Sequence, residues 1–272
     1  MRIFVLLFLT ISNLAFSQKK ELVGNWISDN NEMIAISADD KVEKQTITNS
    51  KLRNQQFYLE IFKDTLSFQD KYYSSSENYE KLHVIQYNLK ILKLTDSVLI
   101  AKPVSRASRK FFNTSDPIKF INQNLIKNDE FNFEKLIFTA SSCNGTCPVL
   151  QMRISGDQKI EMNAKYSDES GLLIDKDKSG SYFGKLNDSL YSELIDLLIK
   201  SKIETLNISN EMLCCDGAVK TIEVYHNGKR NYVQTMFEPR MLRELIGFLY
   251  DLREKPIWLK QTKNLSLKNN YR

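Results

Sequence analysis

Alternating polar and apolar residues fill the chain from residue 21 to about 105, and this pattern limits the fold more than any other feature. In the segment 56–62, for example, Phe57, Leu59 and Ile61 occupy every second position. A period of two places alternate side chains on opposite faces of a strand, and the Asp, Asn, Ser and Lys clusters between segments are typical of turns. Six or more short strands at this spacing predict an antiparallel β barrel or sandwich. The expected strands cover residues 22–27, 33–36, 42–48, 56–62, 65–68, 82–94 and 97–102.

A different pattern follows residue 105. Asp116 precedes Pro117, which is typical of a helix start with a capping side chain and a proline in the first helical position. The apolar residues after it fall on one helical face: Ile118, Ile121 and Leu125. We therefore predict a linker helix within 116–130, between a β-rich domain at 18–115 and a second domain at 131–256.

The second domain mixes strand and helix patterns. Strands are expected at 135–139, 149–154, 159–164, 219–226 and 229–237. Asn227-Gly228 lies between the last two and supplies the two positive-φ residues of a type I′ hairpin. One helix is expected after Asn187, with Leu190, Leu194, Leu197 and Leu198 on one face, and another after Pro239, with Leu242, Leu245, Leu249 and Leu252. The fold class is therefore α+β: an N-terminal antiparallel barrel or sandwich, then an α+β domain with an antiparallel sheet and two main helices.

The N-terminus has the features of a secretory signal peptide. Arg2 is followed by an apolar run over residues 3–16, and Ala15 and Ser17 occupy positions −3 and −1 of a cleavage site before Gln18. The alternative is an uncleaved anchor, but the run is shorter than the roughly 20 apolar residues that span a bilayer. We expect residues 1–17 to be removed, the protein to be periplasmic or secreted, and the mature chain to have no transmembrane segment.

The charge pattern argues against nucleic acid as a partner. Cleavage removes Arg2 and no acid, so the formal charge falls from +5 to +4. A basic tail at 257–272 carries Lys260, Lys263, Lys268 and Arg272 without any acid, which leaves the body neutral. Nucleic-acid binding would require a basic stripe on the folded body.

The four cysteines form two clusters about 70 residues apart: Cys143 and Cys147 in one, and Cys214 and Cys215 in the other. An even number in an exported chain predicts structural disulfides. Closing the long loop between clusters gives about 4 kcal/mol in the chain-entropy model, against about 2 for the local loop. A vicinal bond is disfavoured because adjacent Cα atoms are only about 3.8 Å apart. We favour pairing between the clusters; the alternative is a local Cys143–Cys147 bond with the other two thiols reduced.

Catalytic and metal sites have little support. A tetrathiolate zinc site needs two short Cys knuckles, and a redox dithiol is typically at a helix start, whereas Cys147 precedes Pro148 and an expected strand. His83 and His226 are the only imidazoles; His226 is expected to be exposed beside its hairpin turn, and His83 to face either solvent or the barrel interior. Neither the metalloprotease His pair nor a nucleophile elbow occurs. We assign no catalytic residue, metal or cofactor.

Two segments resemble known families. Gly24-Asn25-Trp26 at the first strand resembles the G-x-W opening of lipocalin-like barrels. The resemblance implies a tryptophan packed across the closed end of a barrel whose cavity binds small apolar ligands.

Residues 131–254 resemble an uncharacterised exported bacterial domain that opens with C-x-G-x-C-P. The matching positions are Cys143, Gly145, Cys147, Pro148, Gly228 and Pro239. The family is a domain of unknown function, so the resemblance implies architecture and export but no activity.

Three hypotheses of function follow. The preferred one is a non-enzymatic exported protein that binds a small apolar ligand or an envelope component. The second is a thiol–disulfide redox enzyme that uses the loop from Cys143 to Cys147. The third is a structural or surface interaction protein without a ligand.

Overall fold

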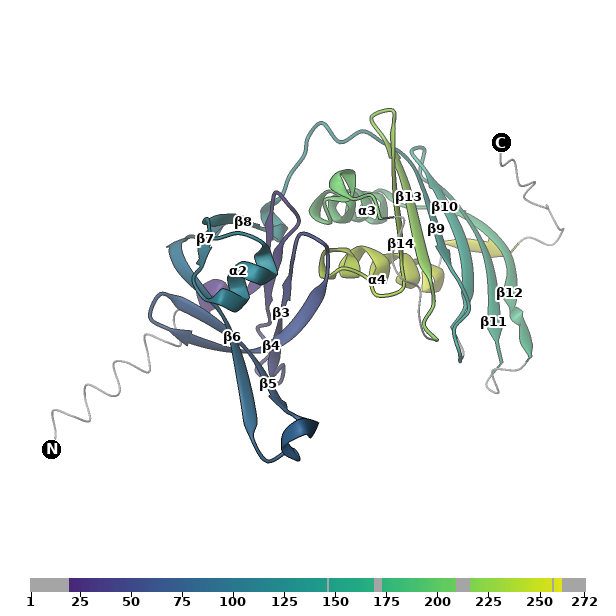
Figure 1. The fold of residues 1–272 in the computed structure, drawn as a ribbon. Helices are drawn as coiled ribbons and strands as arrows, with labels where there is room; N and C mark the ends of the chain where they lie inside the picture. The colour runs from purple at the N-terminus through teal and green to yellow at the C-terminus, as the bar shows by residue number, and fades with distance from the viewer. Residues whose placement is uncertain (1–19, 146, 169–172, 209–215, 256, 261–272) are drawn as a thin grey trace, which may run out of the picture. The chain divides into compact units, whose positions relative to one another are not determined.

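The computed structural model describes residues 20–145, 147–168, 173–208, 216–255 and 257–260 (Figure 1). The chain divides into two compact units. Unit 1 holds the described residues up to Ile126 together with Pro239–Met241, and unit 2 holds the rest.

Unit 1 is a closed barrel of eight antiparallel strands in the order of the sequence, and β8 pairs with β1 to close it. The expected barrel is therefore confirmed and the alternative of a sandwich is wrong. The strands are β1 (Gly24–Ser28), β2 (Met33–Ile36), β3 (Lys44–Thr48), β4 (Asn54–Phe62), β5 (Thr65–Tyr73), β6 (Leu82–Leu94), β7 (Val98–Pro103) and β8 (Ile118–Asn122). Short 3₁₀ turns lie at η1 (Ser75–Glu77) and η2 (Gln123–Leu125).

Large apolar side chains from successive strands form the barrel core. Trp26, Phe68 and Phe120 are fully buried, as are aliphatic residues of the intervening strands. The Trp26 indole donates a hydrogen bond from Nε1 to the Leu22 carbonyl at 2.9 Å, so the polar edge of the ring is satisfied.

The predicted linker helix within 116–130 is wrong, because most of its apolar face belongs to strand β8. Ile118 and Phe120 point into the barrel while β8 pairs with both β1 and β7. Ladder hydrogen bonds on two sides outweigh the local helix-start preference of Asp116-Pro117. The helix of this region lies earlier, at α2 (Arg106–Phe112), where Ser105 and Ser108 form a reciprocal capping box.

Unit 2 is built on a seven-stranded antiparallel sheet with the order β14-β13-β9-β10-β11-β12-β15. Its strands are β9 (Phe133–Ala140), β10 (Val149–Ser155), β11 (Lys159–Ser167), β12 (Ile174–Lys185), β13 (Lys220–His226), β14 (Lys229–Thr235) and β15 (Trp258–Lys260). Two of these were not expected. β12 lacks apolar alternation, and β15 falls inside the predicted basic tail, so residues 258–260 are a strand and not part of a solvated end.

Two helices cover one face of this sheet (Figure 1). They are α3 (Asp188–Lys200) and α4 (Arg243–Asp251); η3 (Ile203–Thr205) follows α3, and η4 (Arg240–Leu242) and η5 (Leu252–Glu254) flank α4. The Asn187 side chain caps α3 by accepting from the Leu190 amide. Leu194 and Leu198 of α3, and Leu245 and Leu249 of α4, are fully buried. Both expected helices and the expected α+β arrangement are confirmed.

The β13–β14 hairpin turns as predicted, with φ of 49° at Asn227 and 69° at Gly228. The expectation of an exposed His226 is wrong, because its side chain is only 3% exposed. The His226 ring stacks on Phe131 at 4.9 Å, and Nε2 lies 2.8 Å from Asn231 Oδ1. His226 directly precedes the turn, on the sheet face that α3 and α4 cover. The register of β13 decides which face a side chain takes, so a residue next to the turn can still be buried.

Candidate functional site

The sulfur locus of unit 2 contains a local disulfide between Cys143 and Cys147, whose Cα atoms are 5.5 Å apart. The favoured pairing between clusters is therefore wrong, and the local alternative holds. The loop-entropy argument concerns the unfolded chain, whereas the folded backbone between β9 and β10 reverses direction and brings these two sulfurs together. Cys214 and Cys215 lie outside the described residues.

Hydrogen bonds attach the disulfide loop to the segment before β13. The Asn144 amide donates to the Asp216 carbonyl at 3.0 Å. Ser141 and Val219 exchange two further bonds at 2.9 Å, one through the Ser141 hydroxyl. The loop therefore has a defined position beside β13, although the covalent link is local.

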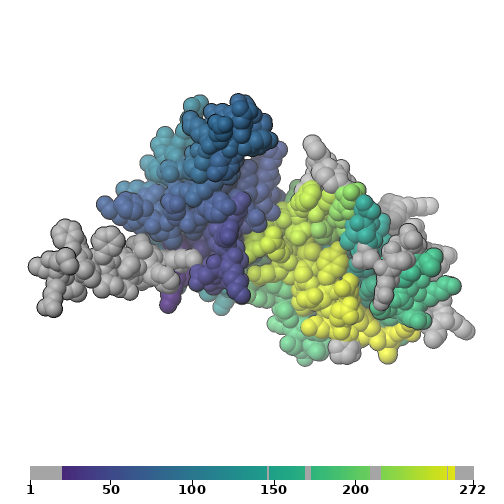
Figure 2. Space-filling model, turned by 90° about the horizontal axis from the view of Figure 1, so that it is seen from below, coloured from purple at the N-terminus to yellow at the C-terminus, as the bar shows by residue number. Residues whose placement is uncertain are grey.

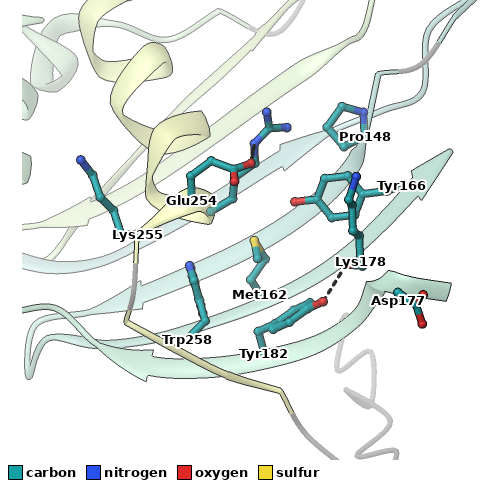
Figure 3. Close-up of a pocket in the computed structure, with 10 residues that line it drawn as sticks. Pro148, Met162, Tyr166, Asp177, Lys178, Tyr182, Glu254, Lys255 and Trp258 are labelled. Atoms are coloured by element: carbon teal, nitrogen blue, oxygen red, sulfur yellow. Dashed lines mark hydrogen bonds and ion pairs between the residues drawn. The ribbon is translucent and has the colours of Figure 1, made fainter. Parts of the chain in front are cut away.

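A pocket of about 640 Å³ lies next to this loop, within unit 2 (Figure 3). Pro148, directly after Cys147, forms part of its wall. The other lining residues come from β11, β12 and the segment from η5 to β15: Met162, Tyr166, Asp177, Lys178, Tyr182, Arg253, Glu254, Lys255 and Trp258. In the space-filling view the yellow C-terminal residues lie directly beside green residues of the middle of the chain, so segments distant in sequence share one surface (Figure 2).

Three aromatic rings give the pocket apolar surfaces. Tyr182 and Trp258 meet edge to face, with centroids 6.4 Å apart and an interplanar angle of 73°. Trp258 Nε1 donates to the Leu252 carbonyl at 2.8 Å, and the Tyr182 hydroxyl donates to the Lys178 carbonyl at 2.6 Å. Both rings are thus held by their polar atoms, which leaves ring surface for contact with a ligand.

The third ring, Tyr166, lies beside a cation. The Arg253 guanidinium carbon is 5.9 Å from the Tyr166 centroid, within the range of a cation–π contact. Burial raises the pKa of the Tyr166 hydroxyl above its ordinary value of 10, against the opposing effect of the Arg253 charge. Arg253 Nε is 2.9 Å from Glu254 Oε1, yet this buried atom makes no hydrogen bond of good geometry among the described residues.

Asp175 organises the part of β12 that carries the pocket's charged residues. Its Oδ1 accepts from the amides of Asp177 at 3.0 Å and Lys178 at 3.1 Å, and its Oδ2 is 3.7 Å from Lys178 Nζ. These bonds, first of all from the Lys178 amide, lower the pKa of the Asp175 carboxyl below its ordinary value of 3.8. Asp175 is therefore ionised at neutral pH and fixes the backbone turn that presents Lys178.

Strand β15 completes the pocket because β12 allows it to approach closely. A Cβ at Gly184 would collide with the Ile257 carbonyl oxygen, so glycine is needed where the two strands meet. Lys260 Nζ donates to the carbonyls of Lys176 at 3.3 Å and Asp177 at 2.6 Å. These contacts hold β15 where Trp258 faces Tyr182.

Of the residues singled out from sequence, only Pro148 lines the pocket. Gly145 lies in the disulfide loop with φ of 153°, Gly228 is in the hairpin turn, and Pro239 is buried before η4. Gly24 and Trp26 lie on β1 of the barrel.

Sequence reasoning missed most of the remaining pocket residues because β12 and the segment from η5 to β15 have no periodic pattern. Met162 lies on an expected strand, but the sequence does not show that its side chain faces a pocket. Gly180 and Gly184 stand four positions apart in the segment that ends at Lys185. Its glycine spacing, together with the aromatic residues Tyr182 and Trp258, was the available indication of a close strand contact.

Comparison with known families finds a match that covers most of unit 2. Residues 134–253 match the family model of a domain of unknown function, DUF6438. The chain therefore contains a DUF6438 domain in its C-terminal part. No curated protein matches the chain.

Sites of two other kinds are absent from the described ranges. No helix there is long and apolar enough to cross a membrane. No group of three or more His, Cys, Asp or Glu side chains in those ranges is placed to hold a metal ion.

Proposed function

We propose that this is an exported, non-enzymatic binding protein whose C-terminal unit holds a component of the cell envelope in the pocket beside the disulfide. One observation carries the proposal: three aromatic rings and three cationic side chains line the same 640 Å³ cavity. Concave sites with apolar walls and a few convergent polar groups are the usual form of small-molecule sites. The charged lining favours an envelope component over the purely apolar ligand.

Export is supported by the N-terminal sequence and by the disulfide, which is typical of oxidising compartments. We further propose that the C-x-G-x-C-P string is a feature of the C-terminal family, since it lies within residues 134–253. A lipocalin-like character of the barrel is supported by its eight strands and by Gly24 and Trp26 on β1.

The test uses the full chain expressed with its N-terminus in a bacterium with an envelope. Intact mass of the protein recovered from the envelope fraction should correspond to a chain that starts at Gln18. Thermal denaturation with soluble lipid, glycan and peptide fractions of the envelope should then show stabilisation by one fraction, and native mass spectrometry should show the bound species. Cytoplasmic retention would contradict export, and the absence of stabilisation by every fraction would contradict the binding function.

A second candidate, thiol–disulfide exchange, is favoured by the position of the half-buried Cys143–Cys147 bond beside the pocket. A substrate thiolate would attack one sulfur, form a mixed disulfide and release the other cysteine as a thiolate. Attack by a second substrate thiol would yield an oxidised substrate and the reduced protein, a transfer of two electrons. If Cys143→Ser leaves oxidase, reductase and isomerase activities unchanged, this candidate is excluded.

A further inference from the structure

The pocket has the two flat surfaces that a sugar ring uses. A pyranose presents a face of C–H groups that packs on an aromatic ring, while its hydroxyl groups project around the rim. Tyr182 and Trp258 are nearly perpendicular, so they form a corner of two ring surfaces. Figure 3 shows this corner on one side of the cavity, with Tyr166 and Pro148 on the opposite side.

The pocket also carries more positive than negative charge. Its cationic residues are Lys178, Arg253 and Lys255, and its acidic residues are Asp177 and Glu254. Lys178 is held near the cavity by the Asp175 turn, although its own side chain is 73% exposed. The guanidinium of Arg253 lies over Tyr166, and its Nε is 2.9 Å from Glu254 Oε1. A carboxylate or phosphate would complete charge-assisted bonds to such groups.

The remaining polar groups suit hydroxyl donors. Asp177 and Glu254 are exposed carboxylates at the rim, and each can accept hydrogen bonds from neighbouring sugar hydroxyls. A lipid chain offers no hydrogen-bonding group to these carboxylates or to the three cations, which makes an acyl ligand unfavourable here.

We infer that the ligand is a pyranose that bears an anionic group, with its ring against Tyr182 and Trp258 and its anion at Lys178 and Arg253. This inference rests on the proposed binding function and adds the chemical class of the ligand. The anion could be a carboxylate or a phosphate, because both satisfy the same cations.

Three sugars with one ring and different charges test the inference. N-acetylglucosamine is neutral, N-acetylmuramic acid adds a lactyl carboxylate to the same ring, and N-acetylglucosamine 6-phosphate adds a phosphate. Titration calorimetry on the full chain should show that at least one anionic sugar binds about tenfold or more tightly than the neutral one. Fluorescence of Trp258, followed in a Trp26→Phe background, should change on binding.

Variants then test separately the cations that would bind the anion and the aromatic ring that would bind the sugar. Lys178→Gln with Arg253→Gln should abolish the preference for the anionic sugar and leave binding of the neutral sugar unaffected. Lys165→Gln with Lys185→Gln removes the same charge from the opposite face of β11 and β12 and should keep the preference. Tyr182→Leu should lower the affinity for all three sugars by up to about tenfold. Tyr182→Phe retains the ring and should bind the sugars with nearly normal affinity.

Equal binding of neutral and anionic sugars, or a preference that survives in the Lys178→Gln, Arg253→Gln protein, would overturn the inference. If no sugar binds while an envelope fraction still stabilises the protein, the ligand class is wrong and the binding function stands. If neither the sugars nor any fraction binds, both are wrong.

Discussion

Lys220 and Glu238 form the most buried ion pair among the described residues of unit 2. Lys220 Nζ lies 2.6 Å from Glu238 Oε2, and it also donates to the Met236 carbonyl at 2.9 Å. Burial acts to raise the pKa of Glu238, but the hydrogen bond and charge of Lys220 and the charge of Arg243 outweigh it. The pKa of Glu238 is therefore below its ordinary value of 4.5.

Glu238→Gln is expected to lower the free energy of unfolding of unit 2 by about 1–2 kcal/mol at pH 7, because it leaves a half-buried ammonium without its carboxylate. A depressed carboxyl pKa stabilises the folded state above the unfolded pKa, and this contribution is lost as pH falls through the folded pKa. The difference in the free energy of unfolding between wild type and variant should therefore be constant from pH 6 to 8 and shrink below about pH 4.5. Urea unfolding across this pH range measures it.

Asp157 supplies the matched comparison at the surface. Hydrogen bonds from Lys159 and Ser155 lower its pKa to about 2, yet the group is fully exposed. Because solvent screens exposed pairs, Asp157→Asn should unfold within error of wild type at pH 7. If Asp157→Asn lowers the free energy of unfolding as much as Glu238→Gln does, then burial is not what makes the Lys220–Glu238 pair stabilising.

At the scale of elements, the contact between β12 and β15 depends on one glycine. Gly184 pairs with Trp258, and the Ile257 carbonyl occupies the space that a side chain would need. The pocket wall formed by Trp258 therefore depends on this position.

Gly184→Ala should displace β15, weaken ligand binding and expose Trp258 to solvent, seen as a red shift of its emission. Gly247→Ala is the control, since this exposed glycine of α4 has nothing within 4 Å of an added Cβ. It should stabilise the protein by about 0.5–1 kcal/mol through helix propensity. Wild-type emission and binding in Gly184→Ala would show that the strand contact tolerates a side chain.

Elements with a strong internal pattern were predictable from sequence, and those defined by their partners were not. α3 and α4 have leucines on one face, and Asn227-Gly228 specifies its own turn, so each was expected correctly. β8 resembles a helix start locally, and β12 is mostly polar; each is a strand because neighbouring strands satisfy its backbone groups.

At the scale of the whole molecule, each unit has its own core and its own tryptophan. The chain has two tryptophans. Trp26 lies in the barrel core, and Trp258 lies in the pocket of unit 2. Single-tryptophan variants therefore report on the two units separately.

Replacing Cys143 and Cys147 together by serine should destabilise unit 2 by about 2 kcal/mol, the value that the chain-entropy model gives for so short a loop. The unfolding midpoint followed through Trp258 should shift to lower urea, while the midpoint followed through Trp26 should stay unchanged. Equal shifts at both probes would mean that the two units unfold as one cooperative body.

The amino-acid sequence by itself determined the local features of this protein: alternating strands for a barrel, two leucine-faced helices and one hairpin turn. These follow from interactions between residues a few positions apart. The sequence could not decide which cysteines pair or on which face of the sheet His226 lies. It also could not show that Tyr166, Tyr182, Arg253 and Trp258 share a pocket. Those outcomes depend on strand register and on the approach of β15 to β12, which join residues up to about 90 positions apart and exist only when the sheet is assembled.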